Sequence, residues 1–277
     1  MAKKLRRIDP LPKAPLAEVV FELHWALQSG PGGQVVLQSD PGLLPLLDGF
    51  TRDIKKAGFG AAKDMSHPLQ TGPHGIARRY FTAADAPFPI MQIGPGIFAT
   101  NESSEYEWKS FKKQIDRGLR VLLAAYPKLG FFKLIPIQIQ LRYVDVFGKS
   151  VLGNAALFHF IERGTSLKIG LPPMLNNRKL FDANAVGRFV YQSKIKERRE
   201  TEFQLDMGSG RNNDTKEDIV RMETKIISKN AGVPALNSHS KFLGEISSWL
   251  EMAHGITSSL FKELITAEVL RNYRIGN

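Results

Sequence analysis

Two carboxylates and an imidazole occupy one phase of an alternating segment near the start of the chain. Glu18, Glu22 and His24 fall on the polar side of this run over residues 18–27. A period of two is typical of a strand with one buried face, so the three side chains should share the other face. A carboxylate beside a histidine can transfer protons, and His254 is the fourth candidate for such a catalytic site. A buried Glu–Arg pair in a sheet is the commoner, structural alternative.

A second alternating run covers residues 133–147. Its polar phase contains Gln138, Gln140 and Arg142. If the two strands are neighbours, their polar side chains form a cluster on one sheet face, and Glu18 is expected to pair with Arg142 across it. Such a pair would be either structural or part of a ligand site.

Basic residues recur on one side of a predicted helix near residues 108–126. They are Lys109, Lys112, Lys113, Arg117 and Arg120. A second basic cluster consists of Lys194, Lys196, Arg198 and Arg199. The whole chain has 38 Lys and Arg against 27 Asp and Glu, a formal net charge of +11. This charge favours nucleic acids, nucleotides or acidic proteins as partners, and the simpler alternative is a solvated basic surface. Aromatic residues are not interleaved with the clusters, so base stacking is not indicated.

Composition disfavours several other classes of site. The chain has no cysteine, and its six histidines do not recur at a zinc-binding spacing. The run from Gly94 to Ala99 fits a loose dinucleotide motif, but strand formers follow it where a helix should begin. We therefore expect neither a cofactor nor a metal ion. No stretch approaches the roughly 20 apolar residues of a membrane span and no signal peptide is predicted, so we expect a cytoplasmic protein without a membrane partner.

Residues 88–126 are the most fully specified part of the chain. Strand formers surround the Gly-Pro-Gly sequence at 94–96, which predicts a bend within one strand. Ser104 and Glu107 have the spacing of a capping box, so a long helix should begin near residue 105. Its apolar positions recur every three or four residues, so one side of the helix must pack on a sheet.

Other helix ends are marked by single residues. Asp40 is expected to cap a helix that begins near residue 43, and Gly58 is expected to end it. Apolar spacing over residues 240–273 predicts one or two further helices, which Gly255 would separate.

These elements predict an α+β protein with a curved, largely antiparallel sheet and long helices packed on one face. The order of strand, helix, several strands and long helix occurs twice, which indicates two similar halves and an ancient duplication. We assign a basic N-terminal arm to residues 1–13 and the two halves to 14–132 and 133–277. The length also allows one continuous domain.

Four short motifs lie far apart in the chain. They are Pro15 to Glu22, Gln92 to Gly96, Leu141 to Asp145, and the set Trp249, His254, Phe261 and Thr266. Together they resemble the landmarks of a sporadically distributed family of uncharacterised prokaryotic cytosolic proteins, over nearly the whole chain. The family has no established reaction or ligand. Its patchy distribution implies mobile genes, and hence a role in anti-phage defence or a toxin–antitoxin system.

The sequence leaves three hypotheses for function. The first is a binding protein, without catalysis of its own, that holds nucleic acid, a nucleotide or an acidic partner on its basic surface. The second is a hydrolase or nuclease that uses Glu18, Glu22, His24 and His254. The third is a protein-interaction subunit. The sequence does not determine the oligomeric state.

Overall fold

A computed structural model of the chain describes residues 15–27, 40, 42–66, 71–103, 106–128, 134–152, 157–168, 187–196, 198, 200–212 and 215–274. The predicted N-terminal arm, residues 1–13, lies outside the described residues. The helices are α1 (Leu43–Lys56), α2 (Trp108–Ala125), α3 (Lys149–Leu152), α4 (Leu157–Gly164), α5 (His239–Leu264) and α6 (Ala267–Arg274), with a 3-10 turn at Asn230–Gly232.

Nine strands form one sheet in the order β2-β3-β4-β5-β1-β6-β9-β8-β7. Every neighbouring pair is antiparallel. The strands are β1 (Leu16–Trp25), β2 (Ala61–Asp64), β3 (Arg78–Phe81), β4 (Ile90–Gly94), β5 (Ile97–Glu102), β6 (Pro136–Phe147), β7 (Arg188–Lys194), β8 (Thr201–Arg211) and β9 (Asp218–Lys229). The α+β class and the largely antiparallel sheet are thereby confirmed.

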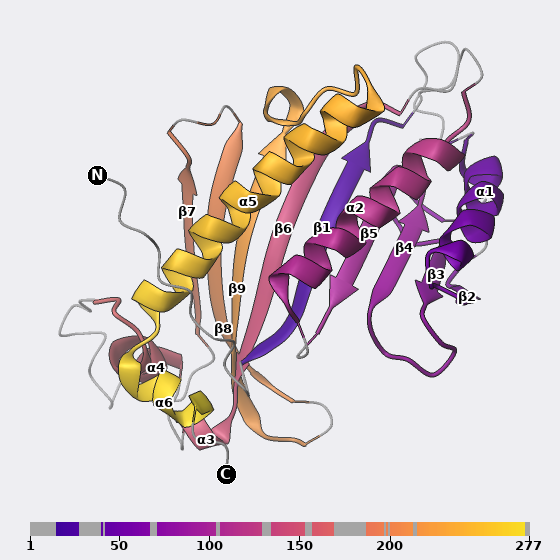
Figure 1. Cartoon of the computed structure of the whole chain (residues 1–277). Helices are drawn as coiled ribbons and strands as arrows, with labels where there is room; N and C mark the ends of the chain where they lie inside the picture. Colours follow the sequence, from indigo (N-terminus) through magenta and orange to yellow (C-terminus); the bar gives the residue numbers. More distant parts are fainter. Residues whose placement is uncertain are drawn as a thin grey trace.

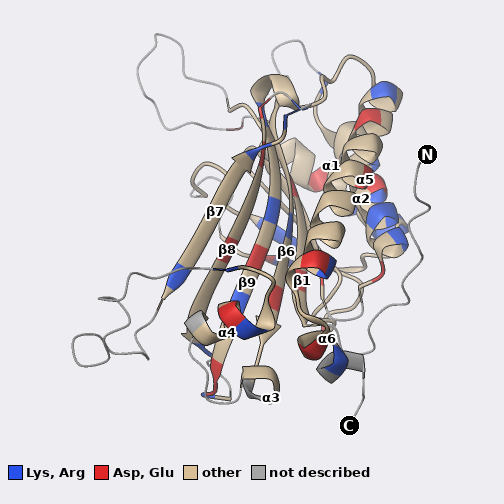
Figure 2. Cartoon of the chain, turned by 90° about the vertical axis from the view of Figure 1, so that its left-hand side faces the viewer, with Lys and Arg blue, Asp and Glu red and all other residues tan. Residues whose placement is uncertain are grey.

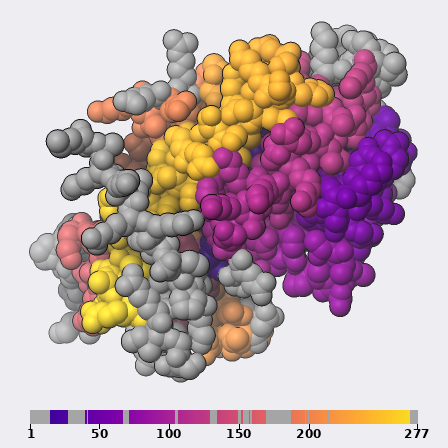
Figure 3. Space-filling model, viewed as in Figure 1, coloured from indigo at the N-terminus to yellow at the C-terminus, as the bar shows by residue number. Residues whose placement is uncertain are grey.

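Helices α1, α2 and α5 lie in front of the sheet, with α2 between the other two (Figure 1). Helix α2 contacts β5, and α5 contacts β6 and β9. Apolar and polar residues alternate along β1, and its apolar residues Phe21, Leu23 and Trp25 face the helices and are fully buried. This apolar face of the strand is what the helices cover. The outer sides of α1, α2 and α5 form one continuous surface (Figure 3).

Asp40 ties three elements together from a buried position. Its carboxylate accepts hydrogen bonds from Trp25 Nε1 at 2.9 Å, from the Gly42 amide at 3.0 Å and from the Tyr126 hydroxyl at 3.3 Å. Gly42, not Asp40, is the N-cap residue of α1. The prediction of Asp40 as the helix cap was therefore wrong by two residues, although its side chain does bind the cap's amide.

The Gly-Pro-Gly sequence is a hairpin turn and not a bend within one strand. Gly94 pairs with Ile97, so Pro95 and Gly96 form the tip between β4 and β5. Gly96 has φ 72°, a conformation that glycine adopts without strain. Proline followed by glycine suits a tight turn of this kind, and the strand formers on both sides are equally compatible with a bend and with a hairpin.

Two predicted helix boundaries also differ from the structure. Helix α2 has Glu107 as its N-cap residue and no side-chain cap, so the capping box is wrong; Ser104 lies outside the described residues. Helix α5 continues through Gly255 and ends at Leu264. The predicted end of α1 is confirmed, since Gly58 follows the cap residue with φ 97° and its amide donates to Lys55 O.

Gly118 allows α2 to approach the sheet closely. A β-carbon at this position would lie 2.4 Å from Cζ of Phe98 and 3.2 Å from Sδ of Met91, and both side chains are fully buried. No real β-carbon tolerates the shorter distance, so either the helix or the phenylalanine ring would have to move.

We predict that Gly118→Ala lowers the free energy of unfolding by about 1–3 kcal/mol, because the overpacking outweighs the better helix propensity of alanine. Gly255→Ala is the matched control, since it lies inside α5 with no atom within 4 Å of the added carbon. This control should gain about 0.5–1 kcal/mol. Urea denaturation of both variants measures the difference, and equal effects would show that α2 does not lie this close to β5.

Candidate functional site

The basic stripe on α2 is partly neutralised by acidic neighbours. Lys112 Nζ lies 2.6 Å from Glu251 Oε1, which comes from α5. Arg120 Nε lies 2.8 Å from Asp116 Oδ2, one turn away on the same helix. These two cations are therefore less available to a ligand than the sequence suggested.

Three cations of the stripe remain without a carboxylate partner among the described residues. They are Lys109, Lys113 and Arg117, which are exposed and follow one another at intervals of four residues. Arg117 Nη1 donates to the carbonyl oxygen of Ala57 at 2.7 Å, so its position is fixed but its charge is not neutralised. Ala57 is the C-cap residue of α1, and the carbonyl dipoles at that helix end attract a cation.

The remaining predicted basic residues lie elsewhere. Lys194 is the last residue of β7, and Lys196 and Arg198 belong to the turn between β7 and β8, at the sheet edge farthest from β2. Arg199 lies outside the described residues. The alternation of β6 places Arg142 in the phase opposite to the core residues Leu141 and Tyr143, on the sheet face that points away from α1, α2 and α5. The nine predicted basic residues that the structure describes therefore do not form a single site.

The face of the sheet opposite α1, α2 and α5 carries a chain of polar contacts over four strands. Arg79 Nε donates to Gln92 Oε1 at 2.9 Å, and Gln92 Nε2 donates to Asn101 Oδ1 at 2.8 Å. Asn101 Nδ2 then donates to Glu18 Oε1 at 2.5 Å. Beside this chain, His24 Nε2 lies 2.8 Å from Glu22 Oε2. Glu18, Glu22 and His24 share one phase of β1, as the alternation predicts, and among the three only Glu22 and His24 are in contact.

The predicted pair between Glu18 and Arg142 is wrong, although β1 and β6 are neighbours. Glu18 lies opposite Val144, and Arg142 lies opposite Val20. Arg142 Nη1 is instead 3.5 Å from Glu223 Oε2, on the strand that borders β6 on its other side. Arg142 Nε is buried and has no hydrogen-bond partner.

Glu223 is the common acceptor for three cations. Its side chain is only 10% exposed and lies 2.5 Å from Arg221 Nη2 and 3.5 Å from Lys225 Nζ, in addition to Arg142. All four residues belong to the polar phase of β6 and β9, so this carboxylate offsets the mutual repulsion of the three cations.

His254 does not join Glu18, Glu22 and His24. It lies on α5, on the other side of the sheet, where Nδ1 is 2.8 Å from the hydroxyl of Tyr143. Its ring stacks on Trp108 with 4.1 Å between the ring centroids. Burial lowers the pKa of His254 to about 4, with Glu251 acting in the opposite direction. The predicted four-residue catalytic site is therefore not assembled.

Tyr143 and Asp145 were not singled out from the sequence as candidates. The Tyr143 hydroxyl lies 2.9 Å from that of Tyr106, and burial raises the pKa of Tyr143 well above its usual value. Asp145 is also buried, and desolvation raises its pKa to about 7. Both residues occupy the apolar phase of β6. A polar residue in an otherwise apolar phase is therefore the sequence feature that could have identified them as candidates.

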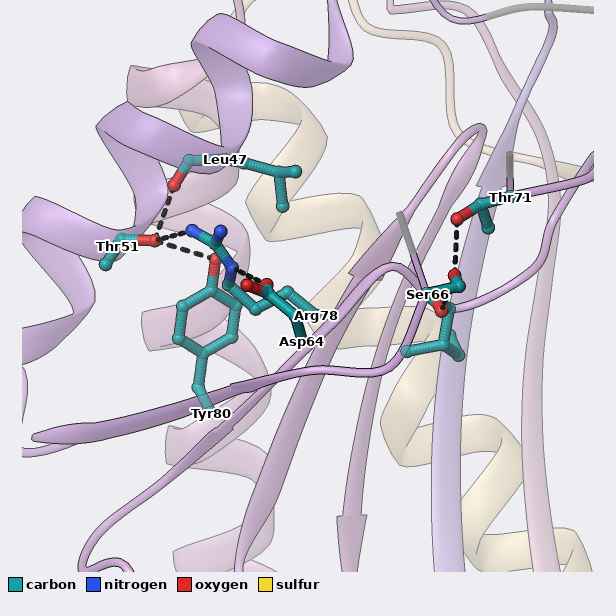
Figure 4. A network of polar contacts seen from close by, with 8 residues as sticks. Leu47, Thr51, Asp64, Ser66, Thr71, Arg78 and Tyr80 are labelled. Carbon is teal, nitrogen blue, oxygen red and sulfur yellow. Dashed lines mark hydrogen bonds and ion pairs between the residues drawn. The ribbon is translucent and has the colours of Figure 1, made fainter. Parts of the chain in front are cut away.

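A further polar network joins α1 to the edge of the sheet (Figure 4). Arg78 Nη1 donates to Thr51 Oγ1 at 3.1 Å, and the hydroxyls of Thr51 and Tyr80 are 3.0 Å apart. Arg78 Nε also donates to Asp64 Oδ1 at 2.5 Å, which links β3 to β2. The polar groups of these side chains hydrogen-bond to one another, so the network serves to hold α1 on β3.

No group of three or more His, Asp or Glu side chains within the described residues could hold a metal ion. None of the helices in that part of the chain is both long and apolar enough to cross a bilayer. Comparison with models of known protein families finds no match, and comparison with curated proteins finds no significant match.

We predict that lowering the pH from 7 to 5 reduces the free energy of unfolding by about 1–2 kcal/mol because of His254. The unfolded histidine takes up a proton near pH 6.5, whereas the folded one stays neutral until about pH 4, so stability is lost as the pH falls. His254→Asn should remove this part of the pH dependence in urea denaturation. His239→Asn, at an exposed position at the start of α5, is the control and should keep it. Equal profiles for the two variants would contradict the assignment.

We also predict that Glu223→Gln lowers the free energy of unfolding by about 1–3 kcal/mol, because it removes the carboxylate that lies within ion-pair distance of all three cations. A double-mutant cycle between Arg142 and Glu223 should give a measurable coupling energy. The same cycle between Arg142 and Glu18 should give a value near zero. The reverse ranking would mean that the contacts of Arg142 are assigned to the wrong strand.

Proposed function

We propose that this protein is a non-catalytic binding protein that holds a polyanion, either nucleic acid or a nucleotide, on the outer side of α2. The observation that carries the proposal is the row Lys109, Lys113 and Arg117, which have no carboxylate partner among the described residues. We call this row the α2 cation row. An uncompensated row has its full charge available for phosphate, whereas salt-bridged lysines must first give up a partner.

The spacing of the row supports contact with a phosphate backbone. Intervals of four residues correspond to about 6 Å along a helix axis, so the three cations span about 12 Å. Phosphates on one strand of a duplex recur about every 3.4 Å along the axis, so a helix lying along the backbone can reach three of them. Trp108 is the aromatic residue at the start of the helix, and it is stacked on His254. The row therefore suits binding that is independent of sequence.

The hydrolase alternative has weaker support in the geometry. His24 and Glu22 are in contact, but His254 lies in the helix layer and Glu18 accepts from Asn101. A carboxylate that binds an amide and a histidine that binds a glutamate form a stable polar surface without any further ligand.

Two broader proposals accompany this function. An accessory role in prokaryotic anti-phage defence or a toxin–antitoxin system rests on the family resemblance of the sequence motifs. A duplication of the two halves is supported by the strand order, since β1 pairs with the last strand of its half, β5, and β6 pairs with β9.

We predict that replacing Lys109, Lys113 and Arg117 together by Gln weakens binding to random-sequence duplex DNA and flattens its salt dependence. With three phosphates contacted, the logarithm of affinity should fall with the logarithm of salt concentration at a slope of about −2 to −3. The triple variant should lose most of this slope in fluorescence anisotropy titrations.

The double variant Lys112→Gln and Arg120→Gln is the control, because both cations also lie on α2 but already have carboxylate partners, Glu251 of α5 and Asp116 of α2. It should keep most of the affinity and the slope. Binding that does not respond to salt, or that is reduced equally by both sets of changes, would remove the α2 cation row as the site.

A further inference from the structure

Strand β7 presents apolar side chains at an open sheet edge. It is the last strand of the sheet, and no other strand within the described residues pairs with its far side (Figure 2). Val190 is 49% exposed and Tyr191 is 51% exposed, which are two of the five exposed large hydrophobic residues in the described chain. Adjacent residues of a strand point to opposite faces, so the edge is apolar on both faces at its centre.

The backbone of β7 also has unused hydrogen-bonding groups. Ser209 N donates to Gly187 O at 3.3 Å and Ile195 N donates to Thr201 O at 2.9 Å, so the odd-numbered residues bond to β8. In an antiparallel ladder the alternate residues direct their N–H and C=O groups the other way. Arg188, Val190, Gln192 and Lys194 therefore point these groups out of the sheet, where an added strand could pair with them.

The opposite edge of the sheet is protected in the usual way. Strand β2 has only four residues, and two of them are Lys63 and Asp64. Short length and charge discourage pairing with another chain. Strand β7 has seven residues and an apolar centre, so the two edges differ in the features that govern strand addition.

The charge along β7 indicates the chemistry of its partner. Arg188 is paired with Asp206, but Lys194, Lys196 and Arg198 have no ion-pair partner among the described residues. A second copy of this chain is a poor partner, because pairing centred on Tyr191 would set Arg188 against Lys194 in a molecule of net charge +11. An acidic segment would instead be attracted to the C-terminal end of β7, where Lys194, Lys196 and Arg198 lie.

We propose that β7 binds an extended segment of an acidic protein as a tenth, antiparallel strand. Apolar residues of the segment lie beside Val190 and Tyr191, and its N-terminal carboxylates lie beside Lys194, Lys196 and Arg198. Main-chain hydrogen bonds supply affinity and the charged end supplies direction. This site is separate from the α2 cation row and does not depend on polyanion binding.

The test uses a fluorescent synthetic peptide with two glutamates followed by Val-Tyr-Val-Thr, titrated with the full chain. Val190→Pro removes one outward N–H without breaking the bonds to β8, so the sheet should remain intact. We expect about tenfold or greater loss of affinity for this variant and little change for the control Val190→Thr. The same peptide with N-methyl groups on its pairing residues should also bind about tenfold more weakly.

A charge exchange tests the partner chemistry even if the proline variant does not fold. Changing Lys194, Lys196 and Arg198 to Glu should transfer preference from the glutamate peptide to one with two lysines. Unaltered binding of the N-methylated peptide would overturn strand addition, and equal binding of both peptides to the unmodified protein would overturn the acidic partner. A concentration-dependent dimer that Val190→Pro abolishes, without peptide binding, would assign the edge to a second copy instead.

Discussion

The pairing of β1 with β6 is the constraint on which the remaining structure depends. Within the one sheet, these two central strands join strands β2 to β5 on one side to strands β7 to β9 on the other, and their register sets Phe21 opposite Leu141 and Leu23 opposite Ile139. All four side chains are fully buried under the helices. A slip of one residue would move them to the other face and bring Glu22 and His24 into the core. Burial of a large apolar side chain stabilises the fold by about 1.5–3 kcal/mol. The observed register is therefore strongly favoured over registers shifted by one residue.

The same register decides what each surface of the protein can do. Because the phase that faces α1, α2 and α5 is largely apolar, the other phase of β1 and β6 places Glu22, His24, Gln140 and Arg142 on the opposite face of the sheet. Helix α2 uses its inner side to pack on β5, with Gly118 allowing the close approach. Its cations are thereby restricted to the outer side. The polar sheet face and the basic helix surface are therefore separated because apolar and polar residues alternate along β1 and β6.

Local patterns in the sequence predicted most elements, because strand alternation and helical spacing are properties of short segments. They did not predict long-range partners. Lys112 and Glu251 are 139 residues apart, and nothing near Lys112 indicates that its charge is neutralised. Arg142 was expected to pair with Glu18 because both lie in the polar phase of strands that could be neighbours, whereas the closer carboxylate is Glu223 on β9, 81 positions after Arg142 in the chain. The two-domain division also stays a prediction, since the central strand pair makes one continuous sheet.

His254 illustrates why a polar residue in the sequence is a poor guide to its own surroundings. Helix α5 has apolar residues on the side that packs on β6 and β9, and His254 lies at the border of that side with Tyr143. The histidine, the tyrosine pair and Trp108 meet only when α5 lies beside the start of α2. Only in this arrangement does the neutral imidazole of His254 share a hydrogen bond with the buried hydroxyl of Tyr143. Sliding α5 along β6 by one turn would break this hydrogen bond, at a cost of about 1–3 kcal/mol for the half-buried imidazole, whereas Tyr143 would keep its contact with Tyr106. The polar contact therefore fixes the position of α5 along the sheet, which the apolar contacts, being non-directional, specify less sharply.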